Sequence, residues 1–166
     1  MKILLTGGTG FVGSSIREEL SKKHSVTSIS RREGVDLSKG TLGEHKEIDN
    51  FDIMIHAAAN VGSVKRVSEL ASEIIDSNLR INLNAYKTAV ECNIKRIINI
   101  NASCIYPAGS EIQDENKLFI GRTHDSSEAF SAAKKLLIHL GMAYRKQNNI
   151  LSNSLILPGV YGPGDY

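Results

Sequence analysis

Three glycines, Gly7, Gly10 and Gly13, follow an apolar run at Lys2–Thr6 and precede a helical pattern at Ser14–Lys23. We predict a strand that turns through these glycines into a helix. Such a turn points the free N–H groups and the positive end of the helix dipole at an anion, most often a pyrophosphate. Gly7 allows the tight turn, Gly10 leaves room for the phosphates, and Gly13 lets helix and strand pack closely. The alternative is a glycine-rich turn that holds no ligand.

A pair of arginines, Arg31 and Arg32, follows the second predicted strand, Val26–Ser30. A guanidinium group makes bidentate hydrogen bonds to phosphate and stays charged at any relevant pH. If a dinucleotide occupies the glycine turn, the arginines suit the 2′-phosphate of NADP, so we predict NADP as the preferred cofactor. Two alternatives stay open. The arginines could be solvated surface residues, and Glu33 could bind the ribose hydroxyls of NAD.

The rest of the chain alternates apolar runs with helical segments. Strands are predicted at Phe51–His56, Arg96–Ile100 and Ser154–Leu157, and helices, the first in one or two pieces, at Leu70–Asn93 and Ser126–Gln147. The last helix has an apolar stripe of Leu136, Leu137, Leu140 and Tyr144. This alternation indicates an α/β fold, a Rossmann-type doubly wound parallel sheet with helices on both faces and ligands at the carboxyl ends of its strands. The polar segment 36–50 is short for a strand–helix unit, so we expect a trimmed sheet there.

Composition fits one globular domain. A chain of 166 residues that is 41% hydrophobic can bury a full core. Its formal charge of +2 favours neither a nucleic-acid nor a membrane partner. Cys92 and Cys104 lack a metal-ligand spacing, so we predict reduced thiols and no metal. The apolar start is too short for a signal peptide, and no run approaches the roughly 20 apolar residues of a membrane span. We therefore expect a cytoplasmic location.

Five sequence blocks, read in order, resemble the extended short-chain dehydrogenase/reductases, the NAD-dependent epimerase/dehydratase family. They are Thr-Gly-Gly-Thr-Gly-Phe-Val-Gly at 6–13, Ile-His-Ala-Ala-Ala at 55–59, Asn82, Ser-Cys-Ile-Tyr-Pro at 103–107 and Val-Tyr-Gly-Pro-Gly-Asp at 160–165. The chain is most similar to nucleotide-sugar epimerases, dehydratases and reductases, and block 103–107 is especially similar to GDP-fucose synthase. The resemblance covers the whole chain and implies one NAD(P)-binding Rossmann domain at residues 1–166.

The resemblance implies a set of cofactor-binding residues. These are Gly7, Thr9, Gly10, Phe11, Val12, Arg31, Arg32, Asp36, Leu37, Ala57, Ala58, Ala59, Lys134 and Pro158. Asp36 and Leu37 resemble the family's pair beside the adenine, although Asp36 could instead cap the turn that follows it. His56 and Asn82 are expected in structural roles, with His56 half-buried.

The family's reaction centre pairs Tyr-x-x-x-Lys with a Ser or Thr. The Tyr moves the proton, the Lys lowers the pKa of the Tyr, and the hydroxyl of the Ser or Thr holds the reacting sugar oxygen. Here Lys134 is present, but Phe130 stands at the Tyr position and Ala102 at the Ser/Thr position. Ser103 lies one residue later, and Cys104 could donate a proton or be a small buried apolar residue. The candidate catalytic residues are thus Lys134, Ser103 and Cys104, and we expect impaired catalysis.

The family's C-terminal substrate lobe, on the order of 100 to 150 residues, is absent from this chain. The resemblance therefore implies a fragment or a free-standing cofactor domain. It implies a dinucleotide and a nucleotide sugar as partners, and, by analogy only, a homodimer through Leu70–Asn93 and Ser126–Gln147. The competing hypothesis is a non-catalytic dinucleotide-binding regulatory or partner module.

Overall fold

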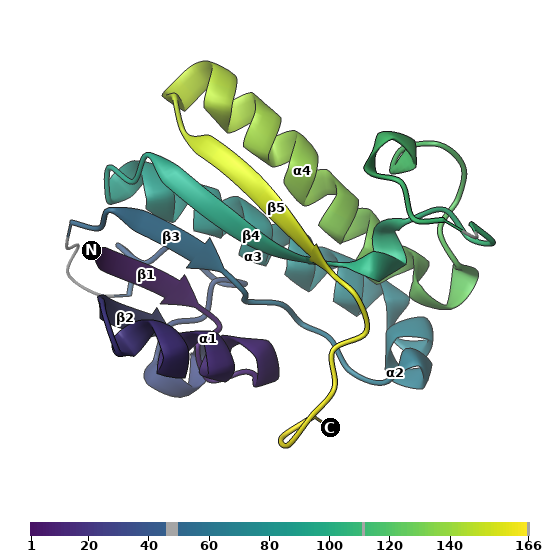
Figure 1. The fold of residues 1–166 in the computed structure, drawn as a ribbon, viewed down its shortest axis with the longest axis horizontal. Helices are drawn as coiled ribbons and strands as arrows, with labels where there is room; N and C mark the ends of the chain where they lie inside the picture. Colours follow the sequence, from purple (N-terminus) through teal and green to yellow (C-terminus); the bar gives the residue numbers. More distant parts are fainter. Residues whose placement is uncertain (46–49, 111, 166) are drawn as a thin grey trace.

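A computed structural model describes residues 1–45, 50–110 and 112–165. Within these ranges five parallel strands form one sheet in the order β2-β1-β3-β4-β5 (Figure 1). The strands are β1 (Lys2–Thr6), β2 (Ser25–Ile29), β3 (Ile53–His56), β4 (Arg96–Ala102) and β5 (Leu151–Leu157). The chain leaves β1 in one direction to β2 and returns to its other side with β3. The carboxyl ends of β1 and β3 therefore border the crevice in which a doubly wound sheet binds ligands.

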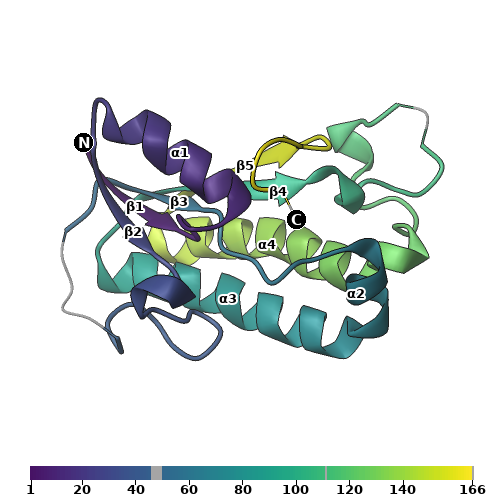
Figure 2. The ribbon, with the colours of Figure 1, turned by 90° about the horizontal axis from the view of Figure 1, so that it is seen from below.

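Helices cover both faces of the sheet, which confirms the predicted doubly wound architecture. Helix α1 (Phe11–Ser21) lies on one face, and α3 (Ala71–Glu91) and α4 (Glu128–Asn148) lie side by side on the other (Figure 2). The short helix α2 (Val64–Glu69) precedes α3.

The core follows from the alternation of side chains along each strand. On β1, Leu4 packs in the larger cluster under α3 and α4, whereas Ile3 and Leu5 pack with Ile16 and Leu20 of α1. Both sides of the central strands are thus buried, as a continuous apolar run predicts for a parallel sheet.

Several boundaries differ from the sequence prediction. Helix α1 begins at Phe11, because the N–H of Ser14 already bonds to the carbonyl of Gly10. A separate helix, α2, precedes α3 because the Ser63 side chain caps its first turn by accepting a bond from the Arg66 N–H.

The prediction that Leu136 belongs to the apolar stripe was wrong. Leu136 is 42% exposed, since its neighbour Leu137 takes the fully buried position.

The connection from β2 to β3 is irregular in its described residues, as the polar composition predicted. It contains the 3₁₀ turn η1 (Arg31–Glu33), and residues 46–49 of the predicted irregular segment lie outside the described ranges. Across the described ranges, no helix has both the length and the apolar character to cross a bilayer.

Candidate functional site

The turn between β1 and α1 depends on two glycines. Gly7 has a φ of +74°, and a Cβ there would lie 2.7 Å from the backbone of Ala58 on the next strand end. A Cβ on Gly13 would collide with the carbonyl oxygen of Gly7, so this glycine sets how closely α1 approaches the turn. Gly10, the residue before α1, differs because, among the residues that the structure describes, an added Cβ would approach only the Gly7 oxygen, at 3.3 Å. Helix α1 begins without a side-chain cap, so its first N–H groups are available to an anion.

A cavity of about 390 Å³ opens at the carboxyl ends of β1, β2 and β3. This volume lies in the usual range of small-molecule sites. Ten of the residues predicted to bind a cofactor line it, namely Gly7, Thr9, Gly10, Arg31, Arg32, Asp36, Leu37, Ala57, Ala58 and Ala59.

Four predicted cofactor residues lie outside this lining: Phe11, Val12, Lys134 and Pro158. Phe11 and Val12 open α1, Lys134 is buried in α4, and Pro158 is exposed just after β5.

The cavity also contains residues that the sequence prediction missed. They are Ile29, Ser30, Val35, Ser38, Asn60, Glu73, Ser77 and Ile81. The last three recur every fourth residue along α3, so they share one helix face. That spacing is the signal that could have placed this face of α3 against the cavity.

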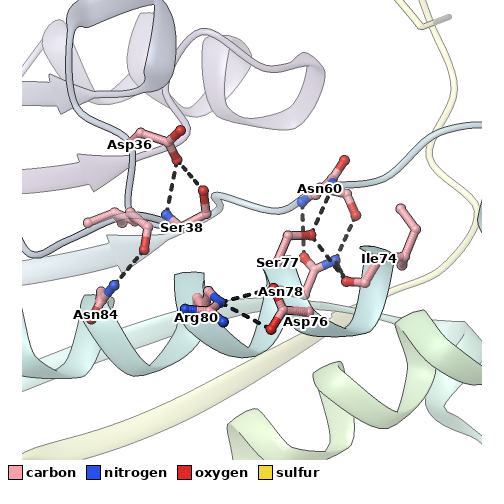
Figure 3. A network of polar contacts seen from close by, with 10 residues as sticks. Asp36, Ser38, Asn60, Ile74, Asp76, Ser77, Asn78, Arg80 and Asn84 are labelled. Carbon is pink, nitrogen blue, oxygen red and sulfur yellow. Dashed lines mark hydrogen bonds and ion pairs between the residues drawn. The ribbon is translucent and has the colours of Figure 1, made fainter. Parts of the chain in front are cut away.

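Two of the loops that line the cavity are attached to α3 (Figure 3). The Asn78 side chain pairs with the backbone of Asn60: its Nδ2 donates to the carbonyl oxygen at 2.7 Å, and its Oδ1 accepts from the N–H at 2.9 Å. The Asn84 Nδ2 donates to the carbonyl oxygen of Leu37 at 2.8 Å. One rigid helix therefore fixes the loop after β2 and the loop after β3 relative to each other.

Asp36 has the local role that the sequence left open. Its Oδ1 accepts bonds from the backbone N–H of Ser38 at 3.0 Å and from the Ser38 hydroxyl at 2.7 Å, which closes the turn (Figure 3). Burial raises the pKa of Asp36, but the two Ser38 bonds and the charges of Lys39 and Arg31 outweigh burial and lower it below the ordinary value. The carboxyl group is thus ionised at neutral pH while lining the cavity.

The two arginines and the neighbouring glutamate face different surroundings. Arg31 and Arg32 are exposed, line the cavity, and form no side-chain hydrogen bond or close ion pair with any other residue of the described ranges. Glu33 is absent from the cavity lining, and its carboxylate bonds to Ser28, Ser30 and Arg17.

Below the cavity, His56 forms a buried network. Asn82 donates its Nδ2 to the Ala133 carbonyl, so its Oδ1 accepts from Nε2 of His56, at 3.1 Å. The Nδ1 of His56 then accepts from the Thr6 hydroxyl at 2.7 Å. Burial, reinforced by the charge of Lys134, lowers the pKa of His56 to about 4. The prediction of a half-buried histidine was wrong, since His56 is fully buried, but its structural role and that of Asn82 agree with the geometry.

Lys134, on α4, is also buried. Its Nζ donates to the carbonyl oxygen of Ile100 at 2.8 Å and lies 5.7 Å from the centre of the Phe130 ring. Burial lowers the pKa of Lys134 to about 8, although a charge on Cys104 would act in the opposite direction. The ammonium is therefore held rigidly next to a side chain that has no proton to exchange.

Phe130 lies in a small apolar cluster with Val67 and Ile74, against which Ala59, Ala102, Cys104 and Ala129 pack. Ala59 also lines the cavity, so this cluster adjoins one end of it.

Cys104 is partly exposed, and its carbonyl accepts a bond from the Ser131 hydroxyl at 2.9 Å. Ser103 begins the 3₁₀ turn η2 (Ser103–Ile105). Within the described residues, no three His, Cys, Asp or Glu side chains gather as metal ligands would.

Comparisons with known proteins, by sequence and by structure, point to the same family. The model of the NAD dependent epimerase/dehydratase family matches residues 3–166. GDP-L-fucose synthase of Dictyostelium discoideum is 29% identical over 98% of this chain and 52% of its own length. The structure of a GDP-L-fucose synthetase from Naegleria fowleri bound to NADP has a TM-score of 0.82 at 26% identity, over 99% of this chain and 52% of that one.

A UDP-glucose 4-epimerase from Thermus thermophilus, in complex with NAD, shares the fold with a TM-score of 0.78 at 24% identity, over 100% of this chain and 58% of that one. Structural relatives thus bind NADP or NAD. The chain spans about half the length of the curated relatives it matches.

Proposed function

Because the chain belongs to the NAD-dependent epimerase/dehydratase family, we propose that it binds a dinucleotide in the described cavity and prefers NADP to NAD. The observation that carries the proposal is the arrangement of donors around this cavity. The uncapped start of α1 opens onto it, and Arg31 and Arg32, which have no side-chain partner among the described residues, stand at the end of β2.

The residues present fit such a ligand at both of these points. The backbone N–H groups of α1 would bind the pyrophosphate, since Gly10 leaves them uncovered. The arginines would bind the 2′-phosphate, and Asp36, Leu37 and the small residues Ala57–Ala59 would lie along the rest of the cofactor. When bound, the nicotinamide ring supplies or accepts a hydride.

We further propose that hydride transfer to a nucleotide sugar is slow or absent in this protein. Phe130 and Ala102 take the places of the family's Tyr and Ser/Thr, and the two side chains belong to one apolar cluster. Lys134 keeps its position but has no phenol to act on. The nearby Ser103 and Cys104 are the remaining candidates for proton transfer.

The apolar cluster also favours a second candidate function. A side-chain set that packs Phe130 against Ala59 and Ala102 is what a non-catalytic dinucleotide-binding module, regulatory or partner-binding, would tolerate. The substrate lobe is proposed to lie outside residues 1–166, and the cytoplasmic location stays a prediction.

A homodimer is proposed through the outer faces of α3 and α4. Leu83 and Val90 on α3, and Leu136 and Met142 on α4, are exposed apolar side chains there.

Titration of the protein with NADPH and NADH, followed by calorimetry, tests the proposed binding. We expect saturable binding of both and tighter binding of NADPH. Absence of binding by either dinucleotide would contradict the proposal. Turnover of GDP-, UDP- and dTDP-sugars by the full natural protein then separates the two candidates, because only a catalyst converts the sugar nucleotide.

A further inference from the structure

We infer that Glu33 is a specificity-determining positioning residue: it holds Arg31 and Arg32 toward the cavity for the 2′-phosphate of NADP, and it does not bind ribose. This inference rests on the proposed dinucleotide function. An acidic residue near the end of β2 would by itself suggest a ribose ligand and hence a preference for NAD. The contacts of Glu33 indicate instead that it does not bind ribose and supports a preference for NADP.

Both oxygens of the Glu33 carboxylate contact protein donors. Its Oε2 accepts from the Ser30 hydroxyl at 2.7 Å and from the Ser28 hydroxyl at 2.9 Å. Its Oε1 lies 3.2 Å from Nη1 of Arg17 on α1. Both oxygens have protein partners and the residue does not line the cavity, so the carboxylate is not presented to a ribose bound there.

The same contacts hold in place the turn that carries Arg31 and Arg32. η1 (Arg31–Glu33) is the segment that carries both guanidinium groups, and Glu33 is its last residue. Its side chain ties the turn to β2 through Ser28, to the residue before the turn through Ser30, and to α1 through Arg17. Backbone bonds from the Glu33 and Val35 N–H groups to the Ser30 carbonyl close the turn, at 2.9 and 3.0 Å.

The charge of Glu33 is also directed away from the phosphate site. A free carboxylate beside Arg31 and Arg32 would compete with a phosphate for these guanidinium groups. Here the carboxylate is compensated by Arg17 instead, and the two arginines form no ion pair with it. The ion pair has side-chain exposures of 49% for Arg17 and 26% for Glu33, so the serine bonds carry more of the positioning than the salt bridge does.

The test is a set of variants titrated with both cofactors by calorimetry. Glu33→Ala should weaken NADPH binding about five- to ten-fold, the equivalent of one positioning hydrogen bond, and leave NADH binding unchanged. Glu33→Gln should recover part of the loss, since an amide oxygen still accepts from the serines. Arg17→Ala should cost less than about two-fold. Glu19→Ala on α1 is the matched control, because within the described ranges its side chain forms only an exposed ion pair with Lys22, the residue after the helix.

The two roles considered for Glu33 predict opposite results. If Glu33→Ala weakens NADH and spares NADPH, Glu33 is a ribose ligand and the inference is wrong. Equal losses for both cofactors, or no loss for either, would also overturn it. If Glu33→Ala does not fold, Ser28→Ala replaces it and should show a smaller shift in the same direction. Binding of neither cofactor by the unmodified protein would instead overturn the proposed function, and the inference with it.

Discussion

The side chain of Asn78 pairs with the backbone of Asn60 through a donor and an acceptor at once, as a neighbouring strand would (Figure 3). Its Nδ2 also donates to the Ile74 carbonyl at 2.7 Å. This bond within α3 fixes the orientation of the amide group that contacts the loop. Asn78 is 1% exposed. The loop after β3, which lines the cavity, is therefore held through its backbone by Asn78, and the Asn60 side chain adds bonds to Ser77 and Arg66.

Replacing Asn78 by Ala should lower the free energy of unfolding by about 1 to 3 kcal/mol, because it leaves partly buried backbone groups of Asn60 unpaired. Urea denaturation measures the change. Asn153→Ala is the control, since Asn153 is exposed on β5. A loss no larger than that of the control would show that water replaces the Asn78 bonds.

Gly7 and Gly10 should respond differently to Ala. Gly7→Ala places a side chain at φ +74° against the Ala58 backbone and should destabilise the fold. Gly10→Ala meets only the Gly7 oxygen at 3.3 Å, so the fold should survive. Its methyl group should nevertheless block the pyrophosphate and abolish binding of either cofactor. Thermal unfolding and calorimetric titration check both effects, and normal cofactor binding by Gly10→Ala would mean that the turn holds no phosphate.

Stability should fall in acid through His56. Its pKa of about 4 in the folded protein is lower than its ordinary value of 6.5. The unfolded chain therefore binds the proton more readily, so this contribution is present above pH 6.5 and is lost as the pH falls toward 4. The linked free energy is about 3 kcal/mol. Chemical denaturation at pH 7 and pH 4.5 measures it, and His56→Asn should reduce the pH dependence over this range.

Lys134 should influence that titration directly. Its charge is the second cause of the low pKa of His56, after burial. Lys134→Met should therefore raise the pKa of His56, as followed by NMR of the imidazole ring. A pKa that stays at about 4 would show that burial alone sets it.

Repair of the reaction centre should restore chemistry if the protein descends from a nucleotide-sugar enzyme. Phe130→Tyr with Ala102→Ser places a phenol one helical turn from Lys134 and a hydroxyl near it. General acid–base catalysis contributes about 10² to 10⁴-fold, so NADPH oxidation with a nucleotide-sugar panel should appear in the double variant of the full natural protein. Substantial turnover by the unmodified protein would make Cys104 or Ser103 the proton donor.

Local pattern predicted the strands and the glycine turn well, because buried parallel strands leave long apolar runs and the turn requires glycine at Gly7. Side-chain networks were harder to foresee. The attachment of Asn60 to Asn78 joins residues 18 positions apart, and that of Leu37 to Asn84 joins residues 47 apart. Nothing in the local sequence indicates either contact. Glu33 shows the same limit, since its serine and arginine partners become visible only when β2 and α1 are packed together.

Arg31 and Arg32 are the residues on which the proposed preference for NADP depends most directly. Calorimetric titration of the unmodified protein and of the Arg31→Ala/Arg32→Ala double variant, each with NADPH and NADH, measures their roles. We predict that the double variant loses roughly 1.5 to 3 kcal/mol of NADPH binding free energy, the worth of hydrogen bonds to a charged group, while NADH binding stays nearly unchanged. Equal losses for the two cofactors, or no loss of NADPH affinity, would contradict the assignment of this site to NADP.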